Sequence, residues 1–305
     1  MTGRLGRADL HIHTLASDGI CGIDEILDRV ERETDLDVIA IADHERIDAA
    51  VAARDMARAR GCRFEVVVGE EITTRGGHLL ALFLEEPVRP LRSLRSTIAA
   101  VHEQGGLAIP AHPLTPYPLC AQGRTLRRLL HDADPSVHPD GLETFNPTAF
   151  GRPLHGRVVA FAEEFGLAAL GNSDAHAAAA IGQCWTTFPG QTAADLRQAI
   201  LDRTTHAHGA FHPASGQLAT FAKQLRKYSR DARDEVRGRL RRDGTGRDHG
   251  YPGGRQRPPR FDPAAASTAV AGAASATALV AAGSAVTAPA RASDASAEQA
   301  VEDRR

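Results

Sequence analysis

The chain has 305 residues, of which 42% are hydrophobic, and a formal net charge of −2 at pH 7, a composition typical of a soluble enzyme with one large domain or two smaller ones. Its four cysteines are widely scattered and form no CxxC pair, which argues against a zinc knuckle or a disulfide framework and favours free thiols in a reducing compartment. The first residues lack the apolar run of a signal peptide, so we expect a cytoplasmic protein.

The small net charge hides three segments of different charge. Residues 1–222 carry a net charge of −8, residues 223–260 a net charge of +8, and residues 261–305 a net charge of −2. An acidic body that binds phosphate needs cations in its site, which agrees with a metal centre. The acidic body also argues against long nucleic acids as the main ligand, because these select basic surfaces.

Apolar segments that end in polar residues predict seven strands, at residues 8–14, 38–43, 64–71, 78–84, 107–112, 141–146 and 168–174. Amphipathic or alanine-rich segments predict helices at 23–33, 47–60, 94–104, 153–165 and 193–203. Ser93 and Thr192 are expected to cap the third and fifth helices, and Trp185 and Phe188 fit a final strand. Repeated βα units predict an α/β fold with a mainly parallel sheet, closed or nearly closed into a barrel.

Polar residues follow several of these strands at equivalent positions. Asp43 and His44 follow one strand, Glu70 and Glu71 another, and His112 a third. In a β/α barrel the carboxyl ends of the strands converge on one rim, where active sites form. We therefore expect a functional site at this rim.

His11 and His13 lie on the same side of the first predicted strand, because alternate side chains of a strand point the same way. Two neighbouring buried imidazoles are hard to satisfy with hydrogen bonds alone, and a divalent metal resolves that cost. Surface or self-satisfied histidines are the alternative.

The complete set of candidate ligands at the rim consists of His11, His13, Asp18, His44, Glu71, His78, His112, Asp174 and His176. Imidazole and carboxylate without thiolate suit Zn, Mn or Fe. Nine ligands are too many for one ion, so we expect two or three divalent ions with a bridging carboxylate. Such a site generates hydroxide at neutral pH and stabilises an in-line displacement at phosphorus, which indicates phosphoester hydrolysis.

These motifs resemble, in order, those of the PHP (polymerase and histidinol phosphatase) superfamily. The resemblance covers about residues 8–210 and implies a distorted seven-stranded (β/α) barrel with a trinuclear site at the C-terminal rim of the strands. The motifs are Asp9-Leu10-His11-Ile12-His13-Thr14, Ala42-Asp43-His44, Gly69-Glu70-Glu71-Ile72, Gly77-His78, Ala111-His112-Pro113 and Asn172-Ser173-Asp174-Ala175-His176.

The resemblance also implies three ligand sets. Glu71 would bridge two ions, with the adjacent Glu70 as a one-residue alternative. The first set is His11, His13, Glu71 and Asp174, the second is Glu71, His78 and His112, and the third is Asp18, His44 and His176.

Other polar residues are candidates for supporting roles. Asp43 and Asn172 are expected to orient ligands, with helix capping or turn formation as the alternative. Candidates for holding substrate phosphate are Arg46, Arg75, Arg124, Arg152 and His155, and for each arginine a solvated surface position is the alternative.

The resulting hypothesis is a metal-dependent phosphoesterase that hydrolyses a phosphomonoester by metal-activated hydroxide. Among proteins that it resembles, nucleoside 3′,5′-bisphosphates and the 5′ ends of short RNAs are substrates, so we expect a small phosphorylated substrate of this class. A histidinol-phosphate-type small-molecule phosphatase and a non-catalytic metal-binding regulatory module are the alternatives.

The C-terminal third differs in character from the barrel. We expect the barrel at 1–222, a basic, arginine-rich arm and linker at 223–260, and an Ala/Ser/Thr-rich, low-complexity, disordered tail at 261–305. The arm could contact nucleic acid or an anionic surface. Residues 264–290 are long enough to span a bilayer, but they contain a single Leu and no Ile, Phe or Trp, so no membrane span is expected.

Overall fold

The computed structural model describes residues 4–116, 119–148 and 151–211. The strands are β1 (Gly6–Ile12), β2 (Val38–Ile41), β3 (Glu65–Thr74), β4 (Gly77–Leu82), β5 (Leu107–Pro110), β6 (Gly141–Phe145), β7 (Ala168–Gly171), β8 (Cys184–Phe188) and β9 (His206–Gly209). The α-helices are α1 (Ile23–Glu33), α2 (Asp48–Arg60), α3 (Leu94–Glu103), α4 (Gly123–Leu130), α5 (His155–Phe165) and α6 (Ala193–Leu201). Short 3-10 turns occupy Pro135–Val137, Arg152–Leu154 and Ala178–Ala180.

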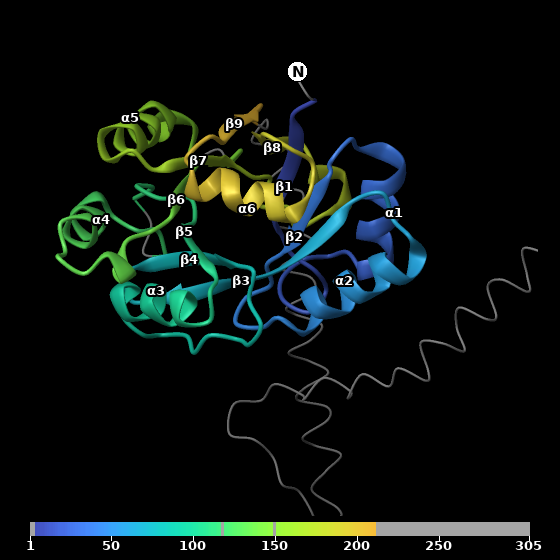
Figure 1. The fold of residues 1–305 in the computed structure, drawn as a ribbon, viewed down its shortest axis with the longest axis horizontal. Helices are drawn as coiled ribbons and strands as arrows, with labels where there is room; N and C mark the ends of the chain where they lie inside the picture. Colours follow the sequence, from blue (N-terminus) through green and yellow to red (C-terminus); the bar gives the residue numbers. More distant parts are fainter. Residues whose placement is uncertain (1–3, 117–118, 149–150, 212–305) are drawn as a thin grey trace, which may run out of the picture. The chain divides into compact units, whose positions relative to one another are not determined.

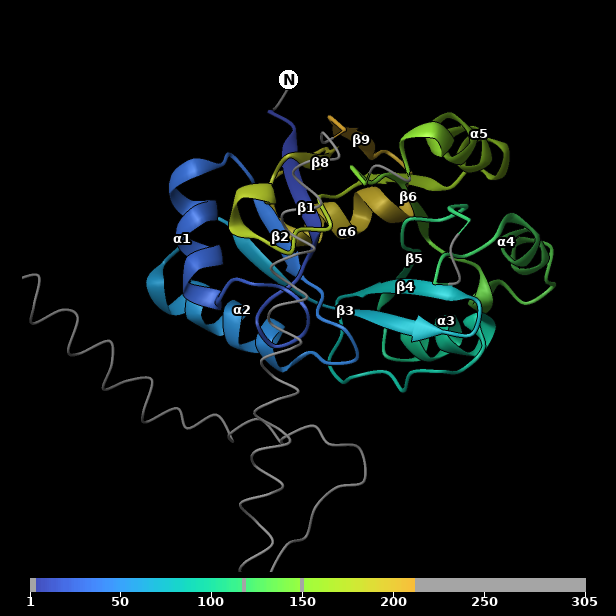
Figure 2. The same ribbon diagram turned by 180° about the vertical axis from the view of Figure 1, so that it is seen from behind.

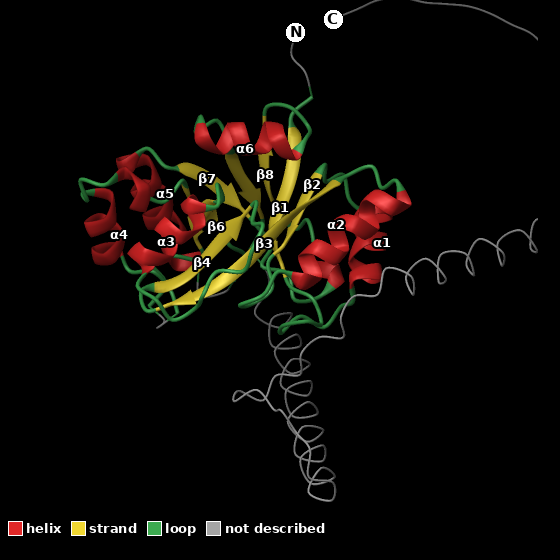
Figure 3. Cartoon of the chain, turned by 60° about the horizontal axis from the view of Figure 1, so that its bottom comes forward, coloured by secondary structure: helices red, strands yellow, loops and turns green. Residues whose placement is uncertain are grey.

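The strands form a curled sheet with the order β5-β4-β3-β2-β1-β8-β9, and β6 pairs separately with β7 (Figure 3). Strand β6 lies beside β5, and β7 lies beside β8 and β9. The hydroxyl of Thr186 on β8 links it to β7, accepting a hydrogen bond from the Gly171 amide and donating one to the Gly171 carbonyl, each at 3.0 Å. The predicted α/β barrel class is confirmed, in the form of a curled half-barrel.

The prediction of a mainly parallel sheet is wrong. Pairs β1–β2, β2–β3 and β6–β7 are parallel, but β3–β4, β4–β5, β1–β8 and β8–β9 are antiparallel. Only Arg75 and Gly76 separate β3 from β4. A parallel pair needs a crossover of a dozen or more residues, so these two strands have to form a hairpin.

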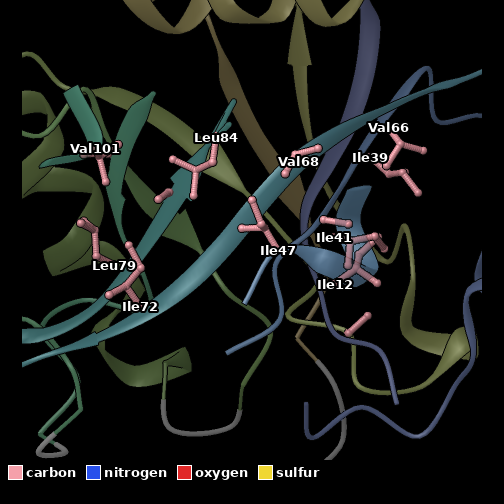
Figure 4. Close-up of a cluster of buried hydrophobic side chains, with 14 of the residues drawn as sticks. Ile12, Ile39, Ile41, Ile47, Val66, Val68, Ile72, Leu79, Leu84 and Val101 are labelled. Carbon is pink, nitrogen blue, oxygen red and sulfur yellow. The ribbon is translucent and has the colours of Figure 1, made fainter. Parts of the chain in front are cut away.

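Two apolar layers cover the two faces of the sheet. In β2, Ile39 and Ile41 belong to the layer that also contains buried residues of α1 to α5 (Figure 4), while Val38 and Ala40 belong to the other layer with α6. Figures 1 and 2 show α1 and α2 packed together near β2 and α6 lying across the strands. Because successive side chains of a strand point to opposite faces, each strand contributes apolar residues to both layers. The polar side chains of the candidate site lie at the strand ends.

The predicted helices agree with the structure within a few residues. Ser93 caps α3 by accepting a hydrogen bond from the Ser96 amide, and Thr192 caps α6 in a reciprocal capping box with Asp195. The predicted helix 153–165 divides into the 3-10 turn and α5, whereas α4 and β9 were not predicted. Helix α4 has eight residues and buries only Leu126 and Leu129, which is too short a pattern to stand out.

The expectations for the arm at 223–260 and the tail at 261–305 lie outside the described residues. Across the described ranges, no helix combines the length and apolar character that a bilayer span requires. All four cysteines are free, as the sequence predicts.

Gly77 begins β4 with a φ of +118°, and a Cβ atom there would collide with the backbone of Ala121. We expect Gly77→Ala to lower the free energy of unfolding by about 2–4 kcal/mol, through backbone strain and steric conflict. Gly61→Ala is the control, because Gly61 also has a positive φ but open space around its added Cβ. Urea unfolding measures both variants, and equal losses would contradict the importance of the close approach to Ala121.

Candidate metal centre

All nine predicted ligands come together at one end of the strands. Their ligand atoms form four groups in which the atoms lie within 4.8 Å of one another. The groups are His11, His13 and Asp174; His13, His44 and Glu71; His13, Asp18 and His176; and Glu71, His78 and His112. Their assignment as metal ligands remains a prediction.

The hairpin explains how His78 reaches this rim although it begins a strand. Because β4 runs antiparallel to β3, its first residues lie where β3 ends, and His78 pairs with Thr73. The Nδ1 atom of His78 lies 2.8 Å from Oε1 of Glu71. His78, at the start of an antiparallel strand, therefore lies at the same rim as the candidate ligands that follow the ends of parallel strands.

Glu71 lies at the middle of the cluster with only 2% of its side chain exposed. Its Oε1 lies 2.8 Å from His78 Nδ1 and 3.0 Å from His112 Nε2. Its Oε2 lies 3.1 Å from His11 Nε2 and 3.3 Å from His13 Nε2. The two oxygens face two groups of imidazoles, as a bridging carboxylate requires.

Glu70, the adjacent alternative, lies outside the cluster. It is buried, and its Oε2 accepts a hydrogen bond of 2.8 Å from the Val88 amide. Burial raises the pKa of Glu70 to about 7. The structure therefore places Glu71, and not its neighbour, among the imidazoles.

The cluster contains buried nitrogen atoms without hydrogen-bond partners among the described residues: His11 Nε2, His13 Nε2 and His78 Nδ1. Such atoms are costly to bury. A cation between imidazole and carboxylate would remove this cost, and the donor set of nitrogen and oxygen suits Zn, Mn or Fe. The residues present therefore fit divalent metal ions.

The electrostatics of the cluster agree with this fit. Burial opposes ionisation of Glu71 and Asp174, but neighbouring imidazoles, with His11 foremost, outweigh it and hold the pKa of both carboxyls well below its usual range. Burial likewise opposes the charged form of His13, yet Asp174 and Glu71 raise its pKa to about 10. The ionised carboxylates attract positive charge, which divalent ions can supply.

Glu143 on β6 forms hydrogen bonds to residues of the cluster and was not predicted. Its Oε1 lies 3.0 Å from His11 Nδ1 and accepts a hydrogen bond from Asn172. Its Oε2 accepts hydrogen bonds from the His112 amide at 2.7 Å and from Asn146 at 3.0 Å. This carboxylate fixes the ring of His11 so that Nε2 faces Glu71.

Asp43 and Asn172, the supporting residues predicted from sequence, hold the backbone next to the candidate ligands, and Asn172 also donates a hydrogen bond to Glu143. Asp43 accepts hydrogen bonds from the Thr14 amide at 2.8 Å and from the hydroxyls of Thr14 and Ser17, and so holds the turn that follows His13. Asn172 accepts a hydrogen bond from the Leu10 amide at 3.1 Å. Cys120, which was not predicted, lies 3.2 Å from His112 Nδ1.

The candidate phosphate-binding residues are more dispersed. Arg46 binds both carboxylate oxygens of Asp48, and Arg75 donates to the Leu91 carbonyl, so both serve the fold. Arg152 lies on the surface with its guanidinium 5.9 Å from the ring centre of Phe211.

His155 is closer to the cluster, because it lines a small cavity together with His112 and Glu143. Its Nδ1 lies 3.0 Å from the Thr144 carbonyl oxygen. Arg124 is exposed on α4 and lines a different cavity, on the side facing α5.

Comparisons with known proteins identify a family and similar chains. Residues 153–205 match a family model described as PHP-associated. The uncharacterized protein MJ1587 of Methanocaldococcus jannaschii is 36% identical over 151 residues, which cover 46% of this chain and 81% of that protein.

Two solved structures share the fold at low sequence identity. One is a two-domain protein from Bacteroides vulgatus containing a predicted PHP-like metal-dependent phosphoesterase, with a TM-score of 0.56, 19% identity and coverage of 72% of this chain and 70% of that one. The other is PsfC from Pseudomonas syringae, with a TM-score of 0.53, 18% identity and coverage of 74% and 99%.

Proposed function

The chain belongs to the PHP domain family, and on that basis we propose that it is a metal-dependent phosphoesterase that hydrolyses a phosphomonoester. The observation that carries the proposal is the set of buried imidazole nitrogens of His11, His13 and His78, which lie 2.8 to 3.3 Å from the oxygens of the ionised Glu71 without forming a hydrogen bond. Two or three divalent ions would satisfy these atoms and concentrate positive charge at the rim.

The proposed ligand sets are the three that the resemblance implies. Glu71 is shared between the set with His11, His13 and Asp174 and the set with His78 and His112. The third proposed set is Asp18, His44 and His176: Asp18 Oδ2 lies 2.9 Å from His176 Nε2 and 3.8 Å from His44 Nε2. The groups of ligand atoms within 4.8 Å instead join Asp18 and His176 with His13, and His44 with His13 and Glu71. When bound, such ions polarise phosphate oxygens and lower the pKa of water so that it can act as a nucleophile at neutral pH.

Exposure within the cluster indicates the side from which substrate enters. The side chains of His11 and Glu71 are 0% and 2% exposed, whereas those of His44 and His176 are 24% and 19% exposed. The third ligand set therefore borders solvent. We propose that the phosphate group of the substrate approaches across this set, while Glu143 and Asp43 hold the buried ligands in place.

The preferred substrates are a nucleoside 3′,5′-bisphosphate or the 5′ end of a short RNA, with a histidinol-phosphate-type substrate as the second candidate. The free thiols agree with a reducing compartment, and we propose the cytoplasm. The basic segment 223–260 is proposed as an arm for nucleic acid or another anionic surface.

Removal of metal tests the proposal directly. We expect a chelator to abolish phosphate release from adenosine 3′,5′-bisphosphate, 5′-phosphorylated RNA, histidinol phosphate and an aryl phosphate, and Mn²⁺ or Zn²⁺ to restore it on the true substrates. His11→Ala should stay inactive after metal is added back. Metal-loaded protein that releases no phosphate from any of these would instead support a non-catalytic metal-binding module.

A further inference from the structure

Asp9 is a buried carboxylate in β1 that is not itself a candidate ligand. Its side chain belongs to a residue with 0% exposure. Its Oδ1 accepts a hydrogen bond of 3.0 Å from the Ser173 amide, and its Oδ2 accepts one of 2.9 Å from the Gly182 amide. A buried carboxylate needs such partners, and Asp9 takes them from residues that are 164 and 173 positions away in the sequence.

The two amides that Asp9 binds stand on either side of one loop. Ser173 directly precedes residues 174–181, which we call the rim loop, and Gly182 directly follows them. Asp174 and His176, two of the candidate ligands, belong to the rim loop. One carboxylate therefore closes, with its two oxygens, the loop that carries two members of the cluster.

The backbone of Asp174 shows why the start of the rim loop has to be held. Its φ is +50°, in the left-handed region, which residues other than glycine adopt only at a cost in free energy. Such a conformation persists where the surrounding structure imposes it. The amides on both sides of Asp174 are bound to β1, since Ser173 donates to Asp9 and Ala175 donates to the His11 carbonyl at 3.0 Å. The direction in which the Asp174 side chain projects therefore depends on these two bonds.

The second oxygen of Asp9 acts at the other end of the rim loop. Beyond its first residues the loop leaves β1, and the His176 carbonyl accepts a hydrogen bond of 2.8 Å from the Ile20 amide. The chain then passes through the 3-10 turn Ala178–Ala180 and returns to Asp9 at the Gly182 amide. Tying both ends of a short loop removes conformations that a loop tied at one end can still adopt. The closure therefore restricts His176 as well as Asp174.

We infer that Asp9 is a positioning residue: by closing the rim loop at both ends, it holds Asp174 and His176 where they face the other candidate ligands. The inference rests on the proposed function and adds to it a residue that prepares the site for metal. Asp174 belongs to the first proposed ligand set and His176 to the third, whereas the second set, around His78, has no member in the rim loop. Loss of Asp9 should therefore affect the first and third sets and spare the second.

Hydrogen exchange of chelator-treated protein tests the closure itself, without metal. In Asp9→Asn an amide N–H₂ group replaces one of the two acceptor oxygens, so one end of the rim loop loses its hydrogen bond. We expect amides in residues 173–182 to exchange at least about tenfold faster than in the wild type, and to accelerate more than those of α3. An equal acceleration in α3 would indicate a general loss of stability and would overturn the positioning role.

Asp37→Asn is the matched control. Asp37 also accepts a hydrogen bond from a backbone amide, that of Arg7 at 3.0 Å, but at the start of β1 and β2, away from the rim. It should leave exchange in the rim loop unchanged, and equal acceleration by the two variants would contradict a special role of Asp9. If Asp9→Asn does not fold, the wild type decides: its Ser173 and Gly182 amides must be protected, and unprotected exchange of either overturns the closure.

Competition for Mn²⁺ with a chelator measures the consequence for metal. Asp9→Asn should bind at least one ion about 10- to 100-fold more weakly than the wild type and Asp37→Asn, and should keep the affinity for another. Adding His78→Ala to Asp9→Asn should weaken the retained ion too, which would locate it in the second set.

The two measurements separate the inference from the proposed function. Unchanged affinity for every ion, despite faster exchange in the rim loop, would show that Asp9 closes the loop without positioning ligands, and would overturn the inference. A wild type that binds no Mn²⁺ would overturn the proposed metal centre instead, and hydrogen exchange alone would then decide whether Asp9 fixes the rim loop.

Discussion

Glu71→Gln will lower kcat/KM for phosphate release by about 10³-fold or more and will remove bound metal. Glutamine keeps the shape of the side chain but loses the negative charge and one acceptor oxygen. Both oxygens of Glu71 face imidazoles at 2.8 to 3.3 Å, so one face of the cluster would meet an amide N–H₂ group instead. The expected loss corresponds to the several kcal/mol that metal ions contribute to stabilising the transition state.

Metal content per chain and kcat/KM for an aryl phosphate measure this effect. Glu70→Gln is the matched control, because Glu70 is the neighbouring buried carboxyl and accepts its hydrogen bond from Val88, outside the cluster. We expect this control to retain metal and turnover. A Glu71→Gln enzyme with wild-type metal content and turnover would overturn the bridging role of Glu71.

The residues of the cluster could be picked out from sequence because they are grouped in short motifs at strand ends. His11 and His13 share one face of a strand, and Asp174 and His176 follow another within five residues. Their convergence needs only the rule that strand ends share a rim. The distances between them were not predictable, because they depend on how the sheet curls.

Strand direction was harder to predict than strand position. The sequence predicts strands at 64–71 and 78–84, which are six residues apart, but β3 continues to Thr74 and leaves the two-residue connection that makes the pair antiparallel. The cavity lined by both Arg124 and Arg157 was also not predictable, because these residues are 33 positions apart in the sequence and line it only in the folded chain.

Glu143 shows a signal that was present in the sequence and not used. It lies in the predicted strand 141–146, between Leu142 and Thr144, and is 1% exposed. A carboxylate inside a buried strand, like a buried pair of histidines, needs hydrogen-bond or ionic partners within the protein. The position of Glu143 within the predicted strand 141–146 thus already indicates a residue that supports the site.

Glu143→Ala will weaken metal binding by about 10- to 100-fold, the range measured when groups that orient metal ligands are removed. The substitution removes the partner of His11 Nδ1 and the acceptor of the His112 amide, so two rings lose their fixed orientation. It also leaves the amides of Asn146 and Asn172 without this acceptor, and each buried donor left unpaired costs about 1–3 kcal/mol of stability.

Competition with a chelator measures the metal affinity of Glu143→Ala, and urea unfolding measures its stability. Asp140→Ala is the matched control, since Asp140 precedes the same strand and accepts hydrogen bonds from the Ala108 amide and His102, away from the cluster. Both variants should be less stable than the wild type, but only Glu143→Ala should lose metal affinity. If the two variants bind metal equally well, Glu143 stabilises the fold without positioning His11 and His112, and the orientation of these rings must then come from the metal ions themselves.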